Sequence, residues 1–306
     1  MKKILFVAAA TMLGLSSCSD NEIFNSVEKS KTPITVNVYQ QNQTRAVTET
    51  TLTKLQSGFK FSAISGTQTY IENATVTFTG GKWDYGTTAY WPTNVSEAVK
   101  FYGVYPATNT LDPANDKVTV TVNGTDDAVV AYKSQSQTTD GSVNLSFSHI
   151  LGQVMIYAMG DNTDFTYTVT GLTLNTENVI DYTCATKATT AAATSAKTDF
   201  TYVADGSAIS APYSSDGIFT SLKGTENANV LALPALSVTL TINYTVASAT
   251  AGSQPLKKSA TFTPQAGKLN RINLTLPSSR TAMTFTVDPI DGWGAETNTP
   301  ATWNAN

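Results

Sequence analysis

The stretch Val238-Thr239-Leu240-Thr241-Ile242-Asn243-Tyr244-Thr245-Val246 alternates apolar and polar residues without a break. Because successive side chains of a β-strand point to opposite faces, this pattern places one side of a strand in a core and the other in water. Similar runs recur along the chain, for example at Val118 to Val122 and Val143 to Phe147. Many short strands between turn residues predict an all-β fold built from antiparallel β-sandwiches.

Turn residues and further alternating runs extend this prediction over most of the chain. Gly80-Gly81 predicts a tight turn after one of the strands. The Ala/Thr-rich stretch from Ala185 to Lys197 is predicted to be a loop, because it has no apolar stripe and its threonines disfavour a helix. The other predicted strands are Gly58 to Ala63, Ala74 to Thr79, Val99 to Tyr105, Ala128 to Tyr132, Phe165 to Leu174, Val179 to Cys184, Phe200 to Val203, Val230 to Leu233, Ala260 to Phe262 and Ile272 to Leu276.

Length and charge limit the functions that need to be considered. The chain has 306 residues, a net charge of −4, and only 14% charged residues. This length allows one large all-β domain or two domains of ordinary size. No basic field is present, so we expect no nucleic-acid binding. The abundance of Thr, Ser and Val predicts almost no helix once the leader is removed.

The N-terminus carries the signals of an exported protein. Lys2 and Lys3 precede an apolar run from Ile4 to Leu15, which is too short to be a permanent membrane span. Leu15-Ser16-Ser17-Cys18 resembles the bacterial lipobox, in which the cysteine receives diacylglycerol and becomes the first residue after cleavage. We therefore predict a lipoprotein signal peptide at 1–17 and lipidation at Cys18. The following Ser19-Asp20-Asn21-Glu22 resembles the acidic signal that sends Bacteroidetes lipoproteins to the outer face of the outer membrane.

Residues 18–45 are predicted to be a lipidated pro-segment that contains a removable strand. Ile34, Val36 and Val38 alternate with polar residues and precede Arg45-Ala46, which lies in a polar stretch that an arginine-specific protease could reach. We predict cleavage between Arg45 and Ala46. Two other readings stay open at this point: cleavage at Lys29 or Lys31, and Arg45 as an ordinary linker residue.

Catalytic and cofactor sites are not expected. Cys184 has no partner for a disulfide if Cys18 is lipidated, and an unpaired cysteine in a strand is typical of a small buried apolar residue. His149 is predicted to be a hydrogen-bonded structural residue. A single histidine and a single free cysteine are too few for a zinc site or for Cys-His catalysis, and the sequence contains no serine triad, paired-carboxylate motif or phosphate loop. We therefore expect no enzyme, no cofactor and no metal.

Two groups of acidic residues could offer oxygen ligands to calcium. They are Asp112-Pro113-Ala114-Asn115-Asp116 and Asp126-Asp127. Neither has the glycine and the distant glutamate of a dedicated calcium loop. They are predicted to be solvated turn residues.

An ordered series of fragments resembles the fimbrillin-like family of Bacteroidetes lipoproteins. The resemblance implies two transthyretin-like β-sandwich domains in tandem, which we place at 46–145 and 146–306, and polymerisation with other pilin subunits into surface pili. It covers nearly the whole chain. The fragments are Tyr90-Trp91-Pro92, Val99 to Pro106, Asp127 to Ala131, Val143 to Val154, Leu231-Ala232-Leu233-Pro234, Ala266-Gly267-Lys268 with Ile272-Asn273-Leu274, and Val287 to Trp293.

Two functions fit these observations. The first is a pilus subunit that loses its pro-segment and assembles by strand exchange, with the C-terminal segment as donor: Met283, Phe285 and Val287, or the tail from Ile290 to Asn306. The second is a permanently lipid-anchored, monomeric surface protein that binds a glycan or a host or bacterial surface ligand. For the second function the aromatic residues Trp83, Tyr85, Tyr90 and Trp91 could form a sugar-stacking platform. The alternative for Trp91, Phe101, Tyr105 and Phe147 is core packing, which we favour.

Overall fold

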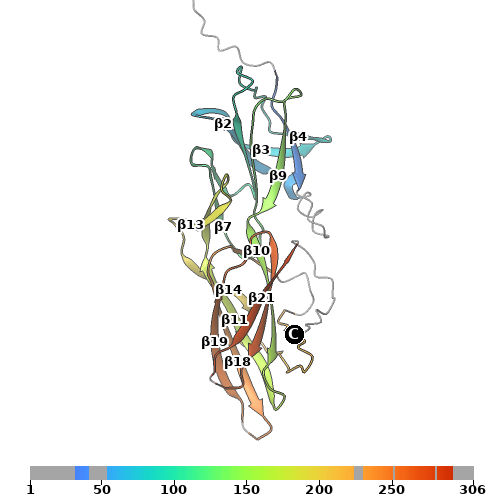
Figure 1. Ribbon diagram of the computed structural model, residues 1–306, viewed down its shortest axis with the longest axis vertical. Helices are drawn as coiled ribbons and strands as arrows, with labels where there is room; N and C mark the ends of the chain where they lie inside the picture. Colours follow the sequence, from blue (N-terminus) through green and yellow to red (C-terminus); the bar gives the residue numbers. More distant parts are fainter. Residues whose placement is uncertain (1–31, 41–53, 224–229, 251, 280, 292–306) are drawn as a thin grey trace, which may run out of the picture.

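The computed structural model describes residues 32–40, 54–223, 230–250, 252–279 and 281–291. Its strands gather at two ends of an elongated molecule, with a smaller sheet between them (Figure 1). Strands dominate this part of the chain, so the all-β prediction is confirmed. The transthyretin-like character of each half stays a prediction.

Seven strands form one sheet at the N-terminal end. Their order is β1-β9-β8-β5-β2-β3-β4, with β1 and β4 at the edges. All neighbours are antiparallel except β1 and β9, which are parallel. The strands are β1 (Thr35–Gln40), β2 (Phe59–Ser65), β3 (Gln68–Thr79), β4 (Lys82–Asp84), β5 (Val99–Tyr105), β8 (Val129–Gln135) and β9 (Ser142–His149).

Aromatic side chains fill the core of this sheet. The Phe59 and Phe147 rings meet edge to face with centroids 4.9 Å apart, and Phe61 stacks on Phe101 at 6.2 Å. Gly103 makes room for this packing, because a Cβ atom there would lie 2.7 Å from Cζ of Phe147. The alternation in β2, β5 and β9 therefore builds one aromatic core, as the sequence pattern predicts.

A second sheet joins the two halves of the chain. Its order is β13-β12-β7-β6, and β7 pairs antiparallel with β12. The short helix η1 connects β6 to β7. The elements are β6 (Thr110–Asp112), η1 (Pro113–Asn115), β7 (Lys117–Thr121), β12 (Val179–Thr183) and β13 (Ala188–Ala191).

The loop predicted at Ala185 to Lys197 is wrong over part of its length. Strand β13 lies inside it and pairs with β12, placing Thr189 opposite Tyr182 and Thr190 opposite Asp181. Lys187 turns the chain with a φ of 57°. The β-branched threonines that argued against a helix favour a strand once a pairing partner is available.

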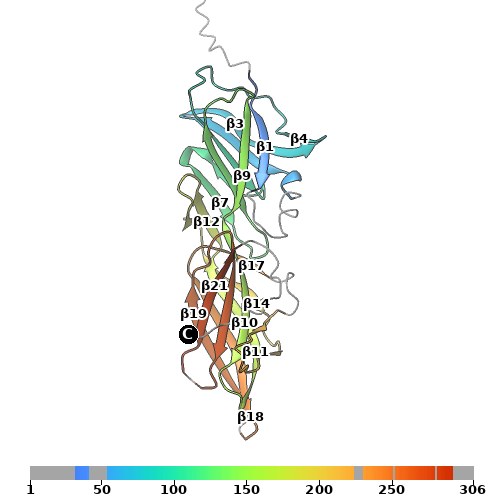
Figure 2. The same cartoon turned by 45° about the vertical axis from the view of Figure 1, so that its right-hand side comes forward.

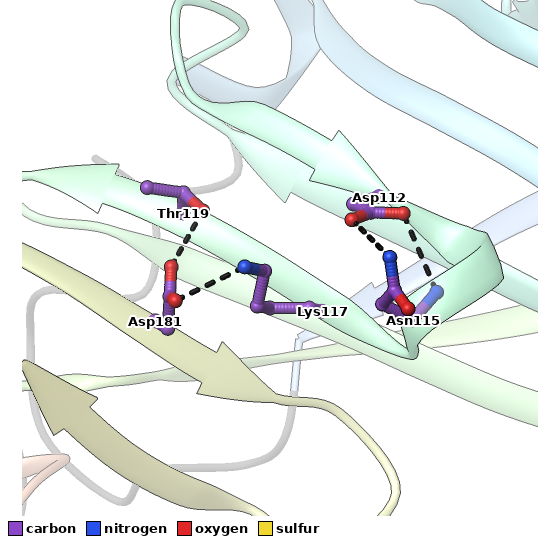
Figure 3. Close-up of polar contacts among 5 residues, drawn as sticks. All are labelled: Asp112, Asn115, Lys117, Thr119 and Asp181. Atoms are coloured by element: carbon purple, nitrogen blue, oxygen red, sulfur yellow. Dashed lines mark hydrogen bonds and ion pairs between the residues drawn. The ribbon is translucent and has the colours of Figure 1, made fainter. Parts of the chain in front are cut away.

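Polar contacts cross the β7–β12 pair where the two halves meet. Asp181 of β12 accepts a 2.6 Å hydrogen bond from Oγ1 of Thr119 and forms a 3.0 Å ion pair with Nζ of Lys117 (Figure 3). Burial opposes the charged carboxylate, but the hydrogen bonds from Thr119 and Lys117 and the charge of Lys117 outweigh it and lower the pKa of Asp181. The ionised form of Asp181 therefore stabilises the junction.

Replacing Asp181 by asparagine should lower the free energy of unfolding at pH 7 by about 1 kcal/mol. A carboxylate whose folded pKa is depressed contributes stability above its unfolded pKa and loses it as the pH falls through the folded pKa. The difference between wild type and Asp181→Asn should therefore shrink between roughly pH 5 and pH 2. Urea titrations across this range measure it, and Asp164→Asn, at an exposed position, is the control. A difference that does not change with pH would contradict this account.

Two sheets face each other at the C-terminal end. In the first, the order is β16-β10-β20-β21, and β17 also pairs with β10. In the second, the order is β14-β11-β18-β19, and β15 pairs with β11. The strands are β10 (Leu151–Gly160), β11 (Phe165–Glu177), β14 (Lys197–Val203), β15 (Ile209–Ser210), β16 (Thr220–Ser221), β17 (Leu231–Pro234), β18 (Val238–Ser248), β19 (Gln254–Phe262), β20 (Lys268–Leu276) and β21 (Thr284–Asp291).

One hydrophobic core runs through this end and on into the junction. In β18 every second residue is buried, from Val238 to Val246, as the alternation predicts. The same core includes Tyr102 of β5 and Val118 of β7, which belong to the first half. The proposed division between residues 145 and 146 falls inside β9, which pairs with β8 as far as His149. Because the core and the β7–β12 sheet are continuous, the two halves of the chain support each other.

Candidate functional site

The strand β1 lies at the edge of the N-terminal sheet, beside β9 (Figure 2). Pairing is in register from Thr35 opposite Ser142 to Gln40 opposite Phe147. Ile34 and Val36 are only 2% and 5% exposed, and Val38 packs partly buried against the same core. The prediction of a strand with an apolar face at this position is confirmed.

Backbone and side-chain hydrogen bonds hold the start of this strand. The amide N of Ile34 donates to the carbonyl of Ala89 over 2.8 Å, and the carbonyl of Ile34 accepts from the Tyr85 hydroxyl over 2.7 Å. The amide of Trp91 donates to the carbonyl of Thr32 over 3.1 Å. Burial raises the pKa of Tyr85, so its phenol stays protonated and acts as a donor at neutral pH. The segment from Tyr85 to Trp91 therefore fastens the strand to the sheet.

The backbone at Gly141 forms the second contact. Its carbonyl accepts both the amide of Thr35 and the indole Nε1 of Trp91, each over 3.0 Å. Gly141 has a φ of 71°, and a Cβ atom here would lie 2.3 Å from the carbonyl oxygen of Pro33. The close approach of Gly141 to the incoming strand is a feature that only the fold reveals.

Loss of β1 would uncover both an apolar surface and a polar edge. The strand covers the core beside Val143, Leu145 and Phe147, all buried, and it pairs with the backbone of β9. Burying Ile34 and Val36 contributes roughly 3–6 kcal/mol relative to leaving them exposed. Unpaired strand edges and exposed apolar grooves are costly in water and are templates for another strand. The candidate site is therefore the place that β1 fills, along the edge of β9 and over the apolar core, which we call the groove.

The four aromatic residues considered for sugar binding do not share one open face. Trp91 and Tyr85 are buried in the core, at 1% and 8% exposure. Trp83 packs against the rings of Phe59 and Phe78, and Tyr90 is exposed. Core packing is thus confirmed for Trp91, and also for Phe101 and Phe147; Tyr105 is partly buried against the same core.

Cys184 and His149 have structural surroundings. Burial raises the pKa of the Cys184 thiol to about 12, and the charge of Asp116 adds to the effect. His149 is buried, and its Nδ1 lies 2.5 Å from Oδ2 of Asp127. Both predictions, a buried apolar cysteine and a hydrogen-bonded histidine, are confirmed.

The acids of the Asp112 to Asp116 turn bind protein groups. Asp112 accepts from the amide N and the side-chain Nδ2 of Asn115, over 3.3 and 2.8 Å, and so caps η1 (Figure 3). Asp116 accepts from the Tyr102 hydroxyl and from the amide of Ala185, each over 3.0 Å. Asp116 therefore links the first half of the chain to the β12–β13 turn, a role that the sequence alone does not reveal.

Other predicted site residues cannot be compared with the fold. Cys18, Arg45, Ala46 and the tail 292–306 lie outside the described residues. Within the described ranges, no three His, Cys, Asp or Glu side chains form a group that could hold a metal ion. None of the helices in this part of the chain is long and apolar enough to cross a membrane.

Comparisons with known proteins identify the family. The model of the fimbrillin-like family matches residues 25–293. A fimbrial protein from Bacteroides vulgatus has a similar structure, with a TM-score of 0.62 and 19% identity over 86% of this chain and 99% of that chain. A candidate cell adhesion protein from Bacteroides uniformis has a TM-score of 0.47 and 17% identity, over 85% of this chain and 97% of that chain. No protein with a curated description matches. Since the family model spans most of the sequence, the chain belongs to the fimbrillin-like family.

Proposed function

We propose that this protein is a structural subunit of a cell-surface pilus that contributes to adhesion. It is exported as a lipoprotein anchored in the outer membrane through Cys18, cut between Arg45 and Ala46, and polymerised by donor-strand exchange with other pilin subunits. Membership of the fimbrillin-like family supports a pilus or adhesin role at the cell surface. The assembly route rests on the position of β1.

The observation that carries the proposal is that β1 fills the groove and is joined to the rest of the chain only through residues 41–53, which include Arg45. While this connection is intact, β1 competes for its groove at an effective concentration on the order of millimolar. A cut after Arg45 turns β1 into part of a separate peptide, which can leave. The groove then accepts the strand of a neighbouring subunit.

The position of β1 in the chain favours Arg45 over Lys29 and Lys31 as the cleavage site. Both lysines precede β1, which begins at Thr35. Cleavage at either lysine would release the lipid but leave the strand attached to the subunit. Only a cut beyond Gln40 frees the whole strand.

The position of β21 narrows the choice of donor. This strand pairs with β20 along its full length, from Thr284 opposite Thr275 to Asp291 opposite Lys268. Met283, Phe285 and Val287 pack against the C-terminal core. Donating β21 would therefore break its own sheet, so we assign the donor role to the tail 292–306, which carries Trp293 and Trp303. A deletion from Ile290 would also remove two pairs of β21.

Deleting residues 292–306 should give a folded, secreted monomer that begins at Ala46 and forms no detergent-resistant ladders on unheated gels. The reason is that the groove stays intact while its occupant is missing. A matched control, deletion of residues 304–306 alone, keeps both tryptophans and should preserve the ladders. Ladders of normal length from the longer deletion would exclude this tail as the donor.

The residue at the N-terminus of the protein on cells separates the two functions. A pilus subunit recovered from the polymer should begin at Ala46. A permanently anchored, monomeric adhesin must keep lipidated Cys18. Mass spectrometry of the surface-exposed protein makes this distinction directly, and a population that begins only at Cys18 would replace the pilus proposal with the anchored one.

A further inference from the structure

A cavity of about 280 Å³ lies in the first half of the chain, beside the end of β7. It is lined by the β5–β6 connection, including Asn109, by Thr121 at the end of β7, and by Asp126 and Asp127 in the turn before β8. The sequence suggests that these two acids are solvated turn residues. Asp126 is exposed, in agreement with this prediction, whereas Asp127 is half-buried, and both line the cavity.

Only one of the two carboxylate oxygens of Asp127 has a hydrogen-bond partner. Its Oδ2 lies 2.5 Å from Nδ1 of the buried His149, whereas Oδ1 is buried and accepts no hydrogen bond within the described structure. It is the one side-chain atom of the described residues that is buried in this way without a partner. Burying a carboxylate oxygen without a hydrogen-bond donor costs free energy. A cation or a hydrogen-bond donor bound to this oxygen would remove that cost.

Asp126 is exposed, and one of its carboxylate oxygens is likewise held by a neighbouring residue. Its Oδ2 accepts from Nδ2 of Asn123 over 2.7 Å, and its amide donates to Oδ1 of Asn123 over 2.8 Å. No described residue donates to the other oxygen, Oδ1. Burial raises the pKa of Tyr105, and the charges of Asp126 and Asp127 both raise it further. The two carboxylates are therefore close enough to influence the same tyrosine, and each has one oxygen that accepts no hydrogen bond from a described residue.

Asn109 is an independent third group. It is only 6% exposed, and no described residue hydrogen-bonds to its side-chain amide, although it lines the cavity. Its backbone is fully used, because the amide donates to Pro106 over 3.1 Å and the carbonyl accepts from Nζ of Lys60 over 2.7 Å. Polar side chains that are this deeply buried normally have a partner.

We propose that this cavity is a calcium site formed by Asp126, Asp127 and Asn109. Two carboxylates and an amide oxygen are hard oxygen ligands, and calcium completes its 6–8 ligands readily with hydroxyls and water. Structural zinc sites are built from Cys and His side chains, and magnesium demands an octahedral arrangement with little freedom. Apart from His149, no described Lys, Arg or His forms an ion pair with either carboxylate. Two carboxylates indicate weak binding, in the range of about 10⁻⁴–10⁻³ M that is typical of extracellular modules.

Calcium at this point would connect the two halves of the chain. The turn that carries both acids forms a bridge to β17, where the amide of Ala232 donates to Gly124 over 2.9 Å. At its other end, Ala128 accepts from the amide of Ile150 over 3.1 Å, between β9 and β10. A cation that orders this turn should therefore stabilise the junction. This site does not depend on how the subunit assembles.

Thermal unfolding of the purified chain from residue 18 to 306, with Cys18→Ser to remove the lipid, tests the proposal. Calcium chloride at 5 mM should raise the Tm by about 2–5 °C relative to sodium chloride of equal ionic strength. Asp126→Asn should abolish this shift, and Asn109→Asp, which adds a carboxylate, should bind calcium several-fold more tightly in a calorimetric titration. The exposed control Asp216→Asn should behave as wild type.

Circular dichroism without calcium verifies that each variant is folded. The proposal is overturned if calcium does not shift the wild-type Tm, or if Asp126→Asn keeps the full shift. It is also overturned if magnesium gives an equal shift, because the cavity would then be a general cation-binding surface.

Discussion

Replacing Arg45 by alanine should leave the protein on cells as a lipid-bearing precursor and reduce polymer to background. Without the cut, β1 stays tethered to its subunit and re-occupies its groove faster than a strand from solution can enter. The accumulated form should begin at Cys18 and carry diacylglycerol. Mass spectrometry of the membrane fraction measures both features, and electron microscopy together with unheated gels measures the polymer.

The control for Arg45→Ala is Lys31→Ala. Lys31 lies in the same pro-segment but precedes β1, so its loss should change neither the Ala46 terminus nor the polymer. Pili of normal length from Arg45→Ala would show that the strand need not be released, and would favour the anchored surface protein. Polymer loss in Lys31→Ala would move the processing site upstream.

Features that depend on local periodicity can be predicted from the sequence alone. The alternation of β18 predicts which of its residues are buried, and the pattern around Val36 predicts a strand with one apolar face. In both cases the spacing of two residues is enough, because it does not depend on the partner strand. The buried position of Phe147 also agrees with this rule, because it alternates with Val143 and Leu145 in β9. The core position of Trp91 is instead favoured over a sugar-stacking platform on other grounds.

The features that depend on distant pairing could not be predicted in this way. Asp181 meets Thr119 and Lys117 only because β12 pairs with a strand from the other half of the chain. The loop expected around Thr190 forms a strand for the same reason. The free oxygen of Asp127 is likewise a result of packing, since His149 and the cavity walls determine what reaches it. The alternation of residues within one strand does not show which distant strand or side chain will lie beside it.

A disulfide between β1 and β9 should make assembly depend on reduction. Asn37 lies directly opposite Asn144 in the strand register, and Nδ2 of Asn37 donates to Oδ1 of Asn144 over 3.2 Å on the exposed face. Side chains paired in this way on neighbouring strands are close enough for Asn37→Cys and Asn144→Cys to be cross-linked. Cys184 should not form a disulfide with either introduced cysteine, because it is buried and the pKa of its thiol is raised to about 12.

The test uses purified chain with Cys18→Ser and an added arginine-specific protease, so that it does not depend on lipid-directed export. The oxidised double variant should be cut after Arg45 and still keep its pro-peptide, so that no polymer forms. Adding dithiothreitol should release the peptide and start polymerisation, since the groove is then open to another strand. The single variants Asn37→Cys and Asn144→Cys should polymerise with or without reductant. Time courses on unheated gels, together with the mass of the released peptide, measure both steps. Equal polymerisation of the oxidised and reduced double variant would mean that β1 does not block the groove, because a strand held covalently in place cannot be exchanged.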